Sequence, residues 1–284
     1  MKLIRFGPFG KEKPGILVDE KRYDLSNIVD DYHEAFFENG QLSMIADAVK
    51  QINNFPLVDT EERWGSPVAR PSKIICIGLN YLDHCIETNS PIPKEPIIFF
   101  KSTTSLCGPY DDLIIPKGST KTDWEVELAF VIGKKASYVA EENANDYIVG
   151  YCLMNDYSER EYQMERGGQW TKGKGCDTFA PLGPYLVTKE EITKPDNLSM
   201  WLTVNGKKYQ NSNTSQLIHK IPFLVHYLSQ YMTLLPGDII STGTPPGVGL
   251  GMKPDPVYLK AGDIVELGIE GLGTSRQHAR KYSG

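Results

Sequence analysis

Two glutamates two positions apart, Glu125 and Glu127, are the strongest sign of chemistry in this sequence. Side chains alternate between the faces of a strand, so both carboxylates point to one face while Trp124 and Val126 point to the other. A solvated strand face would be the commoner explanation of an isolated pair. Here the apolar run Ala129–Ile132 follows directly and indicates a buried strand. Because buried carboxylates need compensation, the pair favours a site for a hard divalent cation.

A third oxygen ligand is available at the end of another apolar segment. The segment Tyr147–Met154 reads as a strand, and Asp156 lies at its end. An aspartate in that position is also a common helix cap, and Ser158–Arg166 has a helical pattern, so capping remains an alternative. Two glutamates and one aspartate would leave open positions on Mg²⁺ or Mn²⁺ for a bidentate oxygen substrate.

A histidine and a glutamate, His84 and Glu87, are spaced three residues apart. On a short helical turn this spacing places both side chains on one face, where the carboxylate can orient the imidazole. Such a pair makes a general base that activates water, although a surface pair without a catalytic role explains the spacing as well. His84 is the best candidate because four other histidines lack a comparable acidic, glycine-rich neighbourhood: His33, His219, His226 and His278.

Two glycine-rich loops, Lys172–Asp177 and Gly243–Gly249, could bring backbone N–H groups close to an anion. Tight turns are the simpler use of such glycines. Lys174 and Thr244 on these loops would nevertheless form a good carboxylate clamp. Neither loop matches the phosphate-binding pattern, and no G-x-G-x-x-G opens a helix after a strand, so a nucleotide cofactor is not expected.

The elements that must position these groups divide into two segments. Short strands are predicted at Lys2–Phe6, Ile16–Asp19 and Tyr23–Leu25, followed by one or two helices up to about residue 54. The stretch Glu61–Pro71 contains glycine and prolines and is typical of a connector. We therefore expect a small amino-terminal α/β domain, residues 1–70, and a larger domain, residues 71–284.

The larger segment is dominated by short apolar or alternating runs, which predict a mostly β domain within an α+β protein. The expected strands are Ile74–Ile77, Ile97–Phe100, Leu113–Ile115, Glu125–Ile132, Tyr147–Met154, Tyr185–Thr188, Met200–Val204, Asp238–Ser241 and Ile264–Ile269. The clearest helix is Thr214–Tyr231, which has one apolar face. The polar end Gly273–Gly284 is expected to fray.

Composition excludes several classes of protein. The 284 residues contain 30 Lys+Arg and 36 Asp+Glu, a net charge of −6 without a basic stripe, so no nucleic-acid partner is expected. No apolar run approaches the roughly 18 residues of a membrane helix, and no signal-peptide pattern opens the chain. We therefore expect a cytoplasmic protein with no membrane partner. The five cysteines contain no C-x-x-C and are typical of reduced core thiols.

Six segments together resemble the fumarylacetoacetate hydrolase family. They are KIICIGLNYLDHCIE at 73–87, PIIFFK at 96–101, DWEVELAFVIGK at 123–134, GYCLMNDYSEREYQ at 150–163, KGCDTFAPLGP at 174–184 and PGDIISTGTPPGVG at 236–249. They occur in the family order, which makes the resemblance stronger than any single motif. It implies that the larger domain is a catalytic domain, a mixed β-sheet roll, and that the protein forms a homodimer.

The resemblance also implies roles for individual residues. A divalent metal, Mg²⁺ or Mn²⁺ with Ca²⁺ as a substitute in crystals, would be held by Glu125, Glu127 and Asp156. The residues implied to activate water or to lie near the reacting atoms are His84, Glu87 and Lys174. The positions that match substrate-binding residues are Arg160, Gln163 and Thr244, with Gly243 beside it. Gly175 and Cys176 depart from the Ser-Phe usual after this lysine, and this difference concerns fine specificity.

The implied reaction is hydrolysis of a carbon–carbon bond in a 2,4-diketo acid, either an acylpyruvate or a 2,4-diketo-3-deoxy sugar acid, to pyruvate and a second acid. The metal would stabilise the pyruvate enolate while the His84–Glu87 pair activates water. The stretch RGGQWTKGK at 166–174 resembles a subgroup named either ureidoglycolate lyase or 2,4-diketo-3-deoxy-sugar-acid hydrolase.

Other functions remain open at this point. On the same scaffold a lyase, isomerase or decarboxylase could act on a related keto acid, as in ureidoglycolate lyase, hydroxymuconate isomerase or oxaloacetate decarboxylase. From a different class, a metal-binding or ligand-binding protein without turnover is the third hypothesis. A complete water-activating pair argues against a pure binder, because binding needs no such pair.

Overall fold

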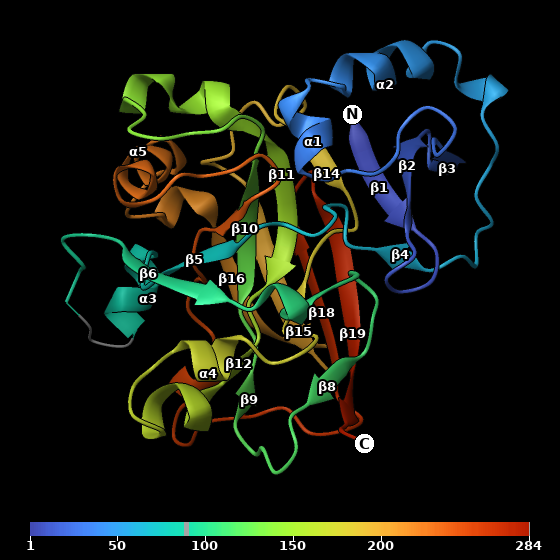
Figure 1. Ribbon diagram of the computed structural model, residues 1–284. Coiled ribbons are helices and arrows are strands. Elements are labelled where there is room, and N and C mark those ends of the chain that lie inside the picture. Colours follow the sequence, from blue (N-terminus) through green and yellow to red (C-terminus); the bar gives the residue numbers. More distant parts are fainter. Residues whose placement is uncertain (88–90, 284) are drawn as a thin grey trace.

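The computed structural model describes residues 1–87 and 91–283, which form two packed β-sheets flanked by short helices (Figure 1). The α-helices are α1 (Glu34–Glu38), α2 (Leu42–Val49), α3 (Leu82–Glu87), α4 (Thr171–Lys174) and α5 (Ile221–Tyr231). Short 3₁₀ segments are η1 (Ile52–Asn54), η2 (Thr103–Ser105), η3 (Glu141–Tyr147), η5 (Thr214–Gln216) and η6 (Gly249–Gly251), and η4 (Glu161–Glu165) is a π-helix.

The strands up to the middle of the chain are β1 (Lys2–Phe6), β2 (Lys13–Val18), β3 (Lys21–Asp24), β4 (Trp64–Gly65), β5 (Ile74–Gly78), β6 (Ile97–Lys101), β7 (Leu106–Cys107), β8 (Leu113–Ile115), β9 (Thr122–Asp123) and β10 (Val126–Ile132). The later strands are β11 (Ile148–Asn155), β12 (Ser158–Glu159), β13 (Ala180–Pro181), β14 (Leu186–Thr188), β15 (Ser199–Val204), β16 (Lys207–Asn213), β17 (Ile239–Ser241), β18 (Ile264–Ile269) and β19 (Gly273–Lys281).

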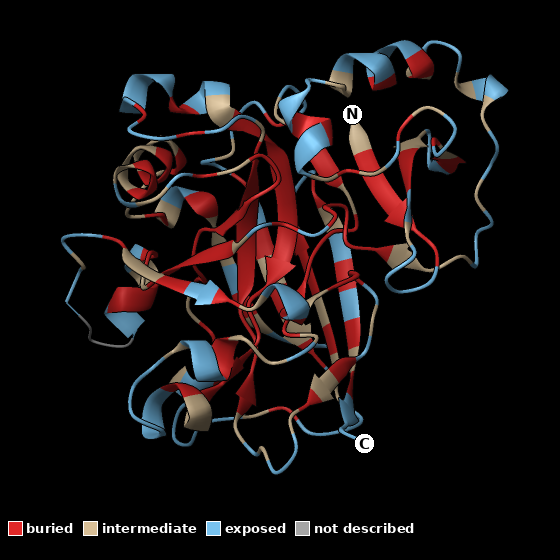
Figure 2. Cartoon of the chain, viewed as in Figure 1, coloured by how far each residue is buried: buried red, intermediate tan, exposed pale blue. Residues whose placement is uncertain are grey.

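The larger sheet has ten strands in the order β3-β2-β1-β14-β11-β10-β17-β5-β6, with β4 beside β1. The pairing of β17 with β5 is parallel, whereas β10 pairs with both β11 and β17 in antiparallel fashion. Every residue of β10 and β11 is buried (Figure 2). Because both faces of these two strands are covered, they read in the sequence as near-continuous apolar runs.

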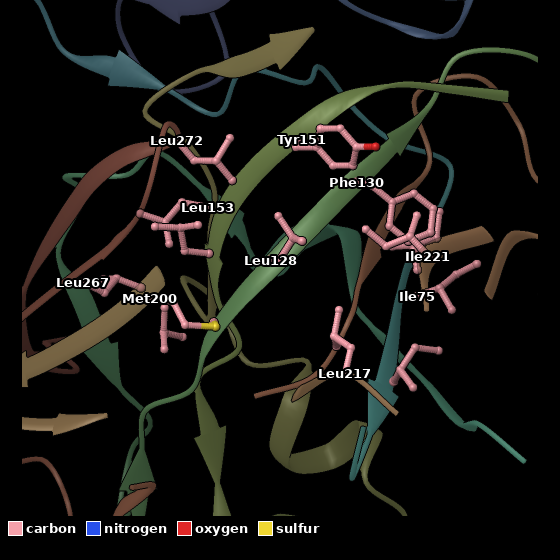
Figure 3. Close-up of a cluster of buried hydrophobic side chains, with 14 of the residues drawn as sticks. Ile75, Leu128, Phe130, Tyr151, Leu153, Met200, Leu217, Ile221, Leu267 and Leu272 are labelled. Atoms are coloured by element: carbon pink, nitrogen blue, oxygen red, sulfur yellow. The ribbon is translucent and has the colours of Figure 1, made fainter. Parts of the chain in front are cut away.

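A five-stranded sheet, β16-β15-β18-β19-β8, packs against one face of β10 and β11. Leu128 and Leu153 of the larger sheet lie in one buried cluster with Met200 and Leu267 of the smaller sheet (Figure 3). All four side chains are at most 1% exposed. Removal of these apolar side chains from water is the main force holding the two sheets together.

The opposite face of the larger sheet is covered by the amino-terminal segment. Phe36 of α1 and Ile45 of α2 share a second buried cluster with Val131 and Ile239. The larger sheet also continues into this segment, since β1 pairs with β14, with Lys2 opposite Val187. The proposed domain boundary near residue 70 stays a prediction.

The predicted mostly β, α+β fold is confirmed, and the predicted strands of the larger segment are present at the expected places. The prediction of one helix over Thr214–Tyr231 was wrong for the first third of this range. Asn213 instead caps the separate turn η5 by accepting the Ser215 N–H, and α5 begins only at Ile221. Pro222 lies in the first turn of α5, where the missing N–H of proline costs no helical hydrogen bond.

Two further expectations need correction, and one strand was missed. The carboxyl-terminal stretch predicted to fray is the strand β19, paired with β18 on one side and β8 on the other. Its buried residues include Ser275 and Gln277, so apolar patterning did not reveal it. The polar edge strand β16 was missed for the same reason. The helix expected over Ser158–Arg166 is the short strand β12 followed by η4.

Gly150 lies where β11 and β14 approach most tightly, and a Cβ at this position would be 2.2 Å from the carbonyl oxygen of Val187. Only backbone movement could relieve that overlap, so we expect Gly150→Ala to lower the free energy of unfolding by about 3 kcal/mol. Gly206→Ala is the matched control, because Gly206 has open space around it. This substitution should cost only about 1 kcal/mol, since an alanine must adopt the positive φ of this residue. Urea unfolding measures the free energy of unfolding of both variants. Equal losses of stability in the two variants would contradict the packing argument.

Four of the five cysteines are buried, Cys76, Cys85, Cys107 and Cys152, as predicted for core thiols. Within residues 1–87 and 91–283, none of the helices combines the length and the apolar character that crossing a bilayer requires.

Candidate active site

The three predicted metal ligands come together at one end of the paired strands β10 and β11. Val126 lies opposite Asn155, so Glu125, Glu127 and Asp156 are neighbours across the ladder, and the Asp156 N–H donates to the Glu125 carbonyl at 2.9 Å. Carboxylate oxygens of all three lie within 4.8 Å of one another, and all three residues are buried. The solvated-face explanation of the glutamates was therefore wrong. The capping explanation was also wrong, because the Asp156 carboxylate accepts from lysines instead.

Two buried lysines and an arginine compensate two of these carboxylates. Lys174 Nζ lies 2.7 Å from Glu125 Oε2 and 2.8 Å from Asp156 Oδ2. Lys101 Nζ lies 2.5 Å from Asp156 Oδ1, and Arg160 Nη2 lies 2.7 Å from Glu125 Oε1. Sequence reasoning missed Lys101. The available signal was a lysine that closes the apolar run Ile97–Phe100 and is drawn inside with it.

The pKa values of the two glutamates move in opposite directions. Burial alone would raise the pKa of Glu125, but the charges of Lys174 and Arg160 outweigh it and lower the pKa to about 2. Burial raises the pKa of Glu127 well above its usual range, and the neighbouring charges of Asp156 and Glu125 raise it further. Within the described residues no lysine or arginine forms an ion pair with Glu127, whose Oε2 accepts from the Ser241 hydroxyl and the Gly243 N–H instead.

The charges at this end of the sheet suit a divalent cation. Four carboxylates, Asp123, Glu125, Glu127 and Asp156, meet three cationic side chains, Lys101, Lys174 and Arg160. One negative charge is therefore in excess when all seven groups are ionised. The nearest donors are all carboxylate oxygens, which Mg²⁺ and Mn²⁺ prefer. The residues present thus fit the metal that the sequence predicted.

Metal binding is expected to stabilise the folded protein measurably. At a free Mg²⁺ or Mn²⁺ concentration about 100-fold above Kd, binding adds about 2.7 kcal/mol, which raises Tm by roughly 5 °C for a protein of this size. Differential scanning fluorimetry after EDTA treatment measures the shift. Potassium chloride at matched ionic strength is the control. An unchanged Tm with Mg²⁺, Mn²⁺ and Ca²⁺ would contradict a metal site.

The predicted water-activating pair lies on α3, as the three-residue spacing indicated. His84 Nδ1 lies 3.1 Å from Glu87 Oε2, and the histidine is only 8% exposed. The Glu87 carboxylate also accepts the Gly247 N–H, at 3.1 Å to Oε1 and 3.3 Å to Oε2. The pair therefore does not lie on an open surface: both residues line the same pocket as Glu125 and Glu127.

The residues predicted to bind substrate are near the predicted metal ligands, and several already form hydrogen bonds within the protein. Arg160 Nη1 donates to Gln163 Oε1 at 3.0 Å, which leaves the Gln163 amide nitrogen as the group that can donate to a ligand. The Thr244 hydroxyl donates to the Val126 carbonyl at 3.0 Å and accepts from Gln210 Nε2 at 2.8 Å. Its single proton points to the backbone here, so donation to a substrate oxygen would require the hydroxyl to give up its bond to the Val126 carbonyl.

These residues surround a pocket of about 560 Å³. Its polar lining residues include His84, Glu87, Glu125, Glu127, Arg160, Gln163, Lys174 and Thr244. Its apolar lining residues include Phe99, Met164, Trp170, Val248 and Leu250. A small number of converging polar groups set in an otherwise apolar cavity is the usual composition of a small-molecule site.

The fold and the site together define a class of protein. Its members have a mixed β-sheet, and one pocket contains buried acidic residues and a histidine–glutamate pair. Residues 73–280 match the family described as fumarylacetoacetate (FAA) hydrolase C-terminal, and the chain belongs to this family. Two relatives, from Burkholderia multivorans and Burkholderia lata, are 54% and 53% identical over 281 residues, 99% of each chain. Both are named provisionally as hydrolases, without a substrate.

Solved structures share the fold over almost the whole chain. A fumarylacetoacetate hydrolase from Exiguobacterium antarcticum is 31% identical with a TM-score of 0.85, covering 99% of this chain and 100% of its own. A 5-carboxymethyl-2-hydroxymuconate delta-isomerase from Mycobacterium smegmatis is 32% identical with a TM-score of 0.78 over 100% of both chains. Maleylpyruvate hydrolase from Sphingobium sp. SYK-6, in complex with manganese(II) and pyruvate, is 27% identical with a TM-score of 0.82 over 100% of both chains. The family and these neighbours support an enzyme.

Proposed function

We propose that this protein is a Mg²⁺- or Mn²⁺-dependent hydrolase that cleaves a carbon–carbon bond of a 2,4-diketo acid to pyruvate and a second acid. The observation that carries the proposal is a single pocket lined by two of the predicted metal ligands, Glu125 and Glu127, and by the His84–Glu87 pair, with the Asp156 carboxylate within 4.8 Å of the two glutamates. Hydrolysis needs both parts, since one side of the substrate must accept electrons and the other must receive water. The Sphingobium neighbour, which holds manganese(II) and pyruvate, supports the pyruvate side.

In this proposal Glu125, Glu127 and Asp156 hold the metal, which when bound supplies Lewis-acid stabilisation of negative charge on the keto-acid oxygens. Lys174 contributes a buried positive charge beside these ligands. Burial alone would lower the pKa of Lys174, but the charges of Asp156 and Glu125 outweigh it and leave the pKa raised, so the side chain stays an ammonium. This charge is available to neutralise the substrate carboxylate or an oxyanion. Arg160 orients Gln163, whose amide N–H groups can donate to substrate oxygens.

His84 acts as the general base, with Glu87 holding the imidazole ring in place. It takes a proton from water as the water oxygen attacks the C4 carbonyl. The C3–C4 bond then breaks, its electron pair passes to C3, and the proton returns to C3 to complete the methyl group of pyruvate. Water is thus divided between the two products, the hydroxyl part going to the new carboxylic acid.

The test is pyruvate release coupled to lactate dehydrogenase, from a panel of acylpyruvates and 2,4-diketo-3-deoxy sugar acids, with and without Mg²⁺ or Mn²⁺. We expect metal-dependent pyruvate release that disappears in His84→Ala. The panel also ranks the acyl groups, which this proposal leaves open between simple acyl chains and deoxy-sugar chains. Release of no pyruvate from any substrate would overturn the proposal.

The isomerase neighbour makes isomerisation of a related keto acid the second candidate. An isomerase needs the metal-held keto acid but no attacking water. It therefore predicts an ultraviolet change of the substrate in place of pyruvate, which Glu125→Ala abolishes. Turnover is kept in His84→Ala when a group other than His84 carries the proton that isomerisation moves. The presence of the His84–Glu87 pair in the pocket favours hydrolysis.

A further inference from the structure

A buried aspartate outside the predicted metal triad, Asp123, holds the guanidinium of Arg160. Asp123 is fully buried in β9, and its Oδ2 accepts from Arg160 Nε at 2.8 Å and lies 2.8 Å from Nη2. The same guanidinium reaches Glu125 Oε1 at 2.7 Å and Gln163 Oε1 at 3.0 Å. Arg160 is therefore fixed from several directions and forms a rigid anchor for Asp123.

The same carboxylate binds the backbone of a loop that comes from the far end of the sequence. Asp123 Oδ1 accepts the Gly249 N–H at 2.6 Å, and Oδ2 accepts the Leu250 N–H at 2.9 Å. A Cβ on Gly249 would lie 1.9 Å from the Val257 carbonyl oxygen and 2.7 Å from Asp123 Oδ1. This position of the loop therefore depends on a glycine that packs between the Val257 backbone and the Asp123 carboxylate.

The other end of this loop carries the partner of the water-activating pair. The Gly247 N–H donates to the Glu87 carboxylate, and the Gly247 carbonyl accepts from the indole Nε1 of Trp124 at 3.0 Å. Trp124 follows Asp123 directly and is fully buried. The backbone from Gly247 to Leu250 is thus held at one end by Glu87 and at the other by Asp123.

We propose that Asp123 is a positioning residue that fixes the 247–250 loop against Arg160 and thereby holds Glu87 in the orientation that His84 requires. The proposal rests on the proposed function, in which His84 is the general base. Asp123 does not touch the reacting atoms in this account. Supporting groups that orient a site in this way typically cost 10- to 100-fold in activity when removed.

The first experiment measures how firmly the 247–250 loop is held and does not depend on enzyme activity. Hydrogen–deuterium exchange is measured on a peptide covering residues 245–252 in the wild type and in Asp123→Asn. Asparagine has one acceptor oxygen in place of two, so it loses a bond to Gly249, Leu250 or Arg160. We expect exchange in this peptide to be at least about tenfold faster in the variant, since each tenfold reflects about 1.4 kcal/mol of opening free energy.

Asp111→Asn is the matched control. Asp111 also pairs with an arginine, Arg63, and accepts a backbone N–H, that of Gly108 at 2.7 Å, but it does not line the pocket. It should lose a comparable set of hydrogen bonds without changing exchange in residues 245–252 or altering kcat. Equal exchange of this peptide in Asp123→Asn and the wild type would overturn the loop part of the proposal.

The second experiment asks whether Asp123 acts through Glu87. We expect Asp123→Asn to lower kcat for pyruvate release by about 10- to 100-fold in the wild type, but by about twofold or less in a Glu87→Gln background. A purely structural role would cost the same factor in both backgrounds, and that result would overturn the proposal. If the wild type releases no pyruvate at all, the proposed function fails, while the exchange experiment still decides the loop.

Leu250→Pro keeps the proposal testable if Asp123→Asn does not fold. This substitution removes one N–H that Asp123 accepts and leaves the buried carboxylate and Arg160 in place. Faster exchange in residues 245–252 with a lower kcat is the expected result. Unchanged kcat in folded Leu250→Pro with a released loop would show that the loop does not position Glu87.

Discussion

Glu127→Gln is expected to lower metal-dependent turnover by about a thousandfold while the protein stays folded. Glu127 is the predicted metal ligand that has no ion pair among the described residues, so its charge is the one most available to a cation. Loss of Lewis-acid stabilisation of about 4 kcal/mol corresponds to this factor. The measurement is kcat/KM for pyruvate release at several Mn²⁺ concentrations, together with Mn²⁺ affinity by calorimetry.

Two observations separate this effect from damage to the fold. The glutamine oxygen can still accept from the Ser241 hydroxyl and the Gly243 N–H, and the substitution removes a charge that Glu125 and Asp156 repel. The Tm of the metal-free variant should therefore be no lower than that of the wild type. Glu12→Gln is the control, a half-buried glutamate paired with Arg63 away from the pocket. Full activity in Glu127→Gln would remove this residue from the metal site.

His84→Ala is expected to lower kcat by about a thousandfold without weakening metal binding. General-base catalysis by a positioned side chain contributes about 10²- to 10⁴-fold, and no second histidine lines the described part of the pocket to replace it. His84 is also not among the predicted metal ligands, so the Mn²⁺ affinity should stay within about threefold of the wild type. Stopped assays of pyruvate and calorimetry with Mn²⁺ measure the two quantities.

His33→Ala is the control for this prediction, because His33 caps α1 in the amino-terminal segment and lies outside the pocket. It should keep full turnover. If His84→Ala keeps turnover as well, while Glu127→Gln loses it, the water-activating role is wrong and the isomerase alternative becomes the better account. The two predictions thus separate the metal site from the hydrolytic half of the proposal.

Local patterns were sufficient for the strands and for the shared face of Glu125 and Glu127. Alternation along a strand is set by the backbone itself, and a long apolar run indicates that both faces are covered. The spacing of His84 and Glu87 likewise predicted their hydrogen bond, because helical geometry brings together residues three apart. These features depend on neighbours within one element. The polar strands β16 and β19 were missed because they are held by backbone pairing with β15 and β18 and most of their buried residues are polar, so neither strand has an apolar pattern.

The role of Asp156 was open in the sequence between a cap and a ligand, and the register of β10 against β11 resolved where it lies. Asp123 carried no distinctive local pattern, and the apolar run before Lys101 indicated that this lysine is buried but not which group it pairs with. Lys101 meets Asp156 across 55 positions, and Asp123 meets Gly249 across 126. The sequence specifies the charge of each group. The group that compensates this charge depends on which distant segment of the chain packs against it. Burial makes that pairing obligatory, and only the packed sheets determine the partner.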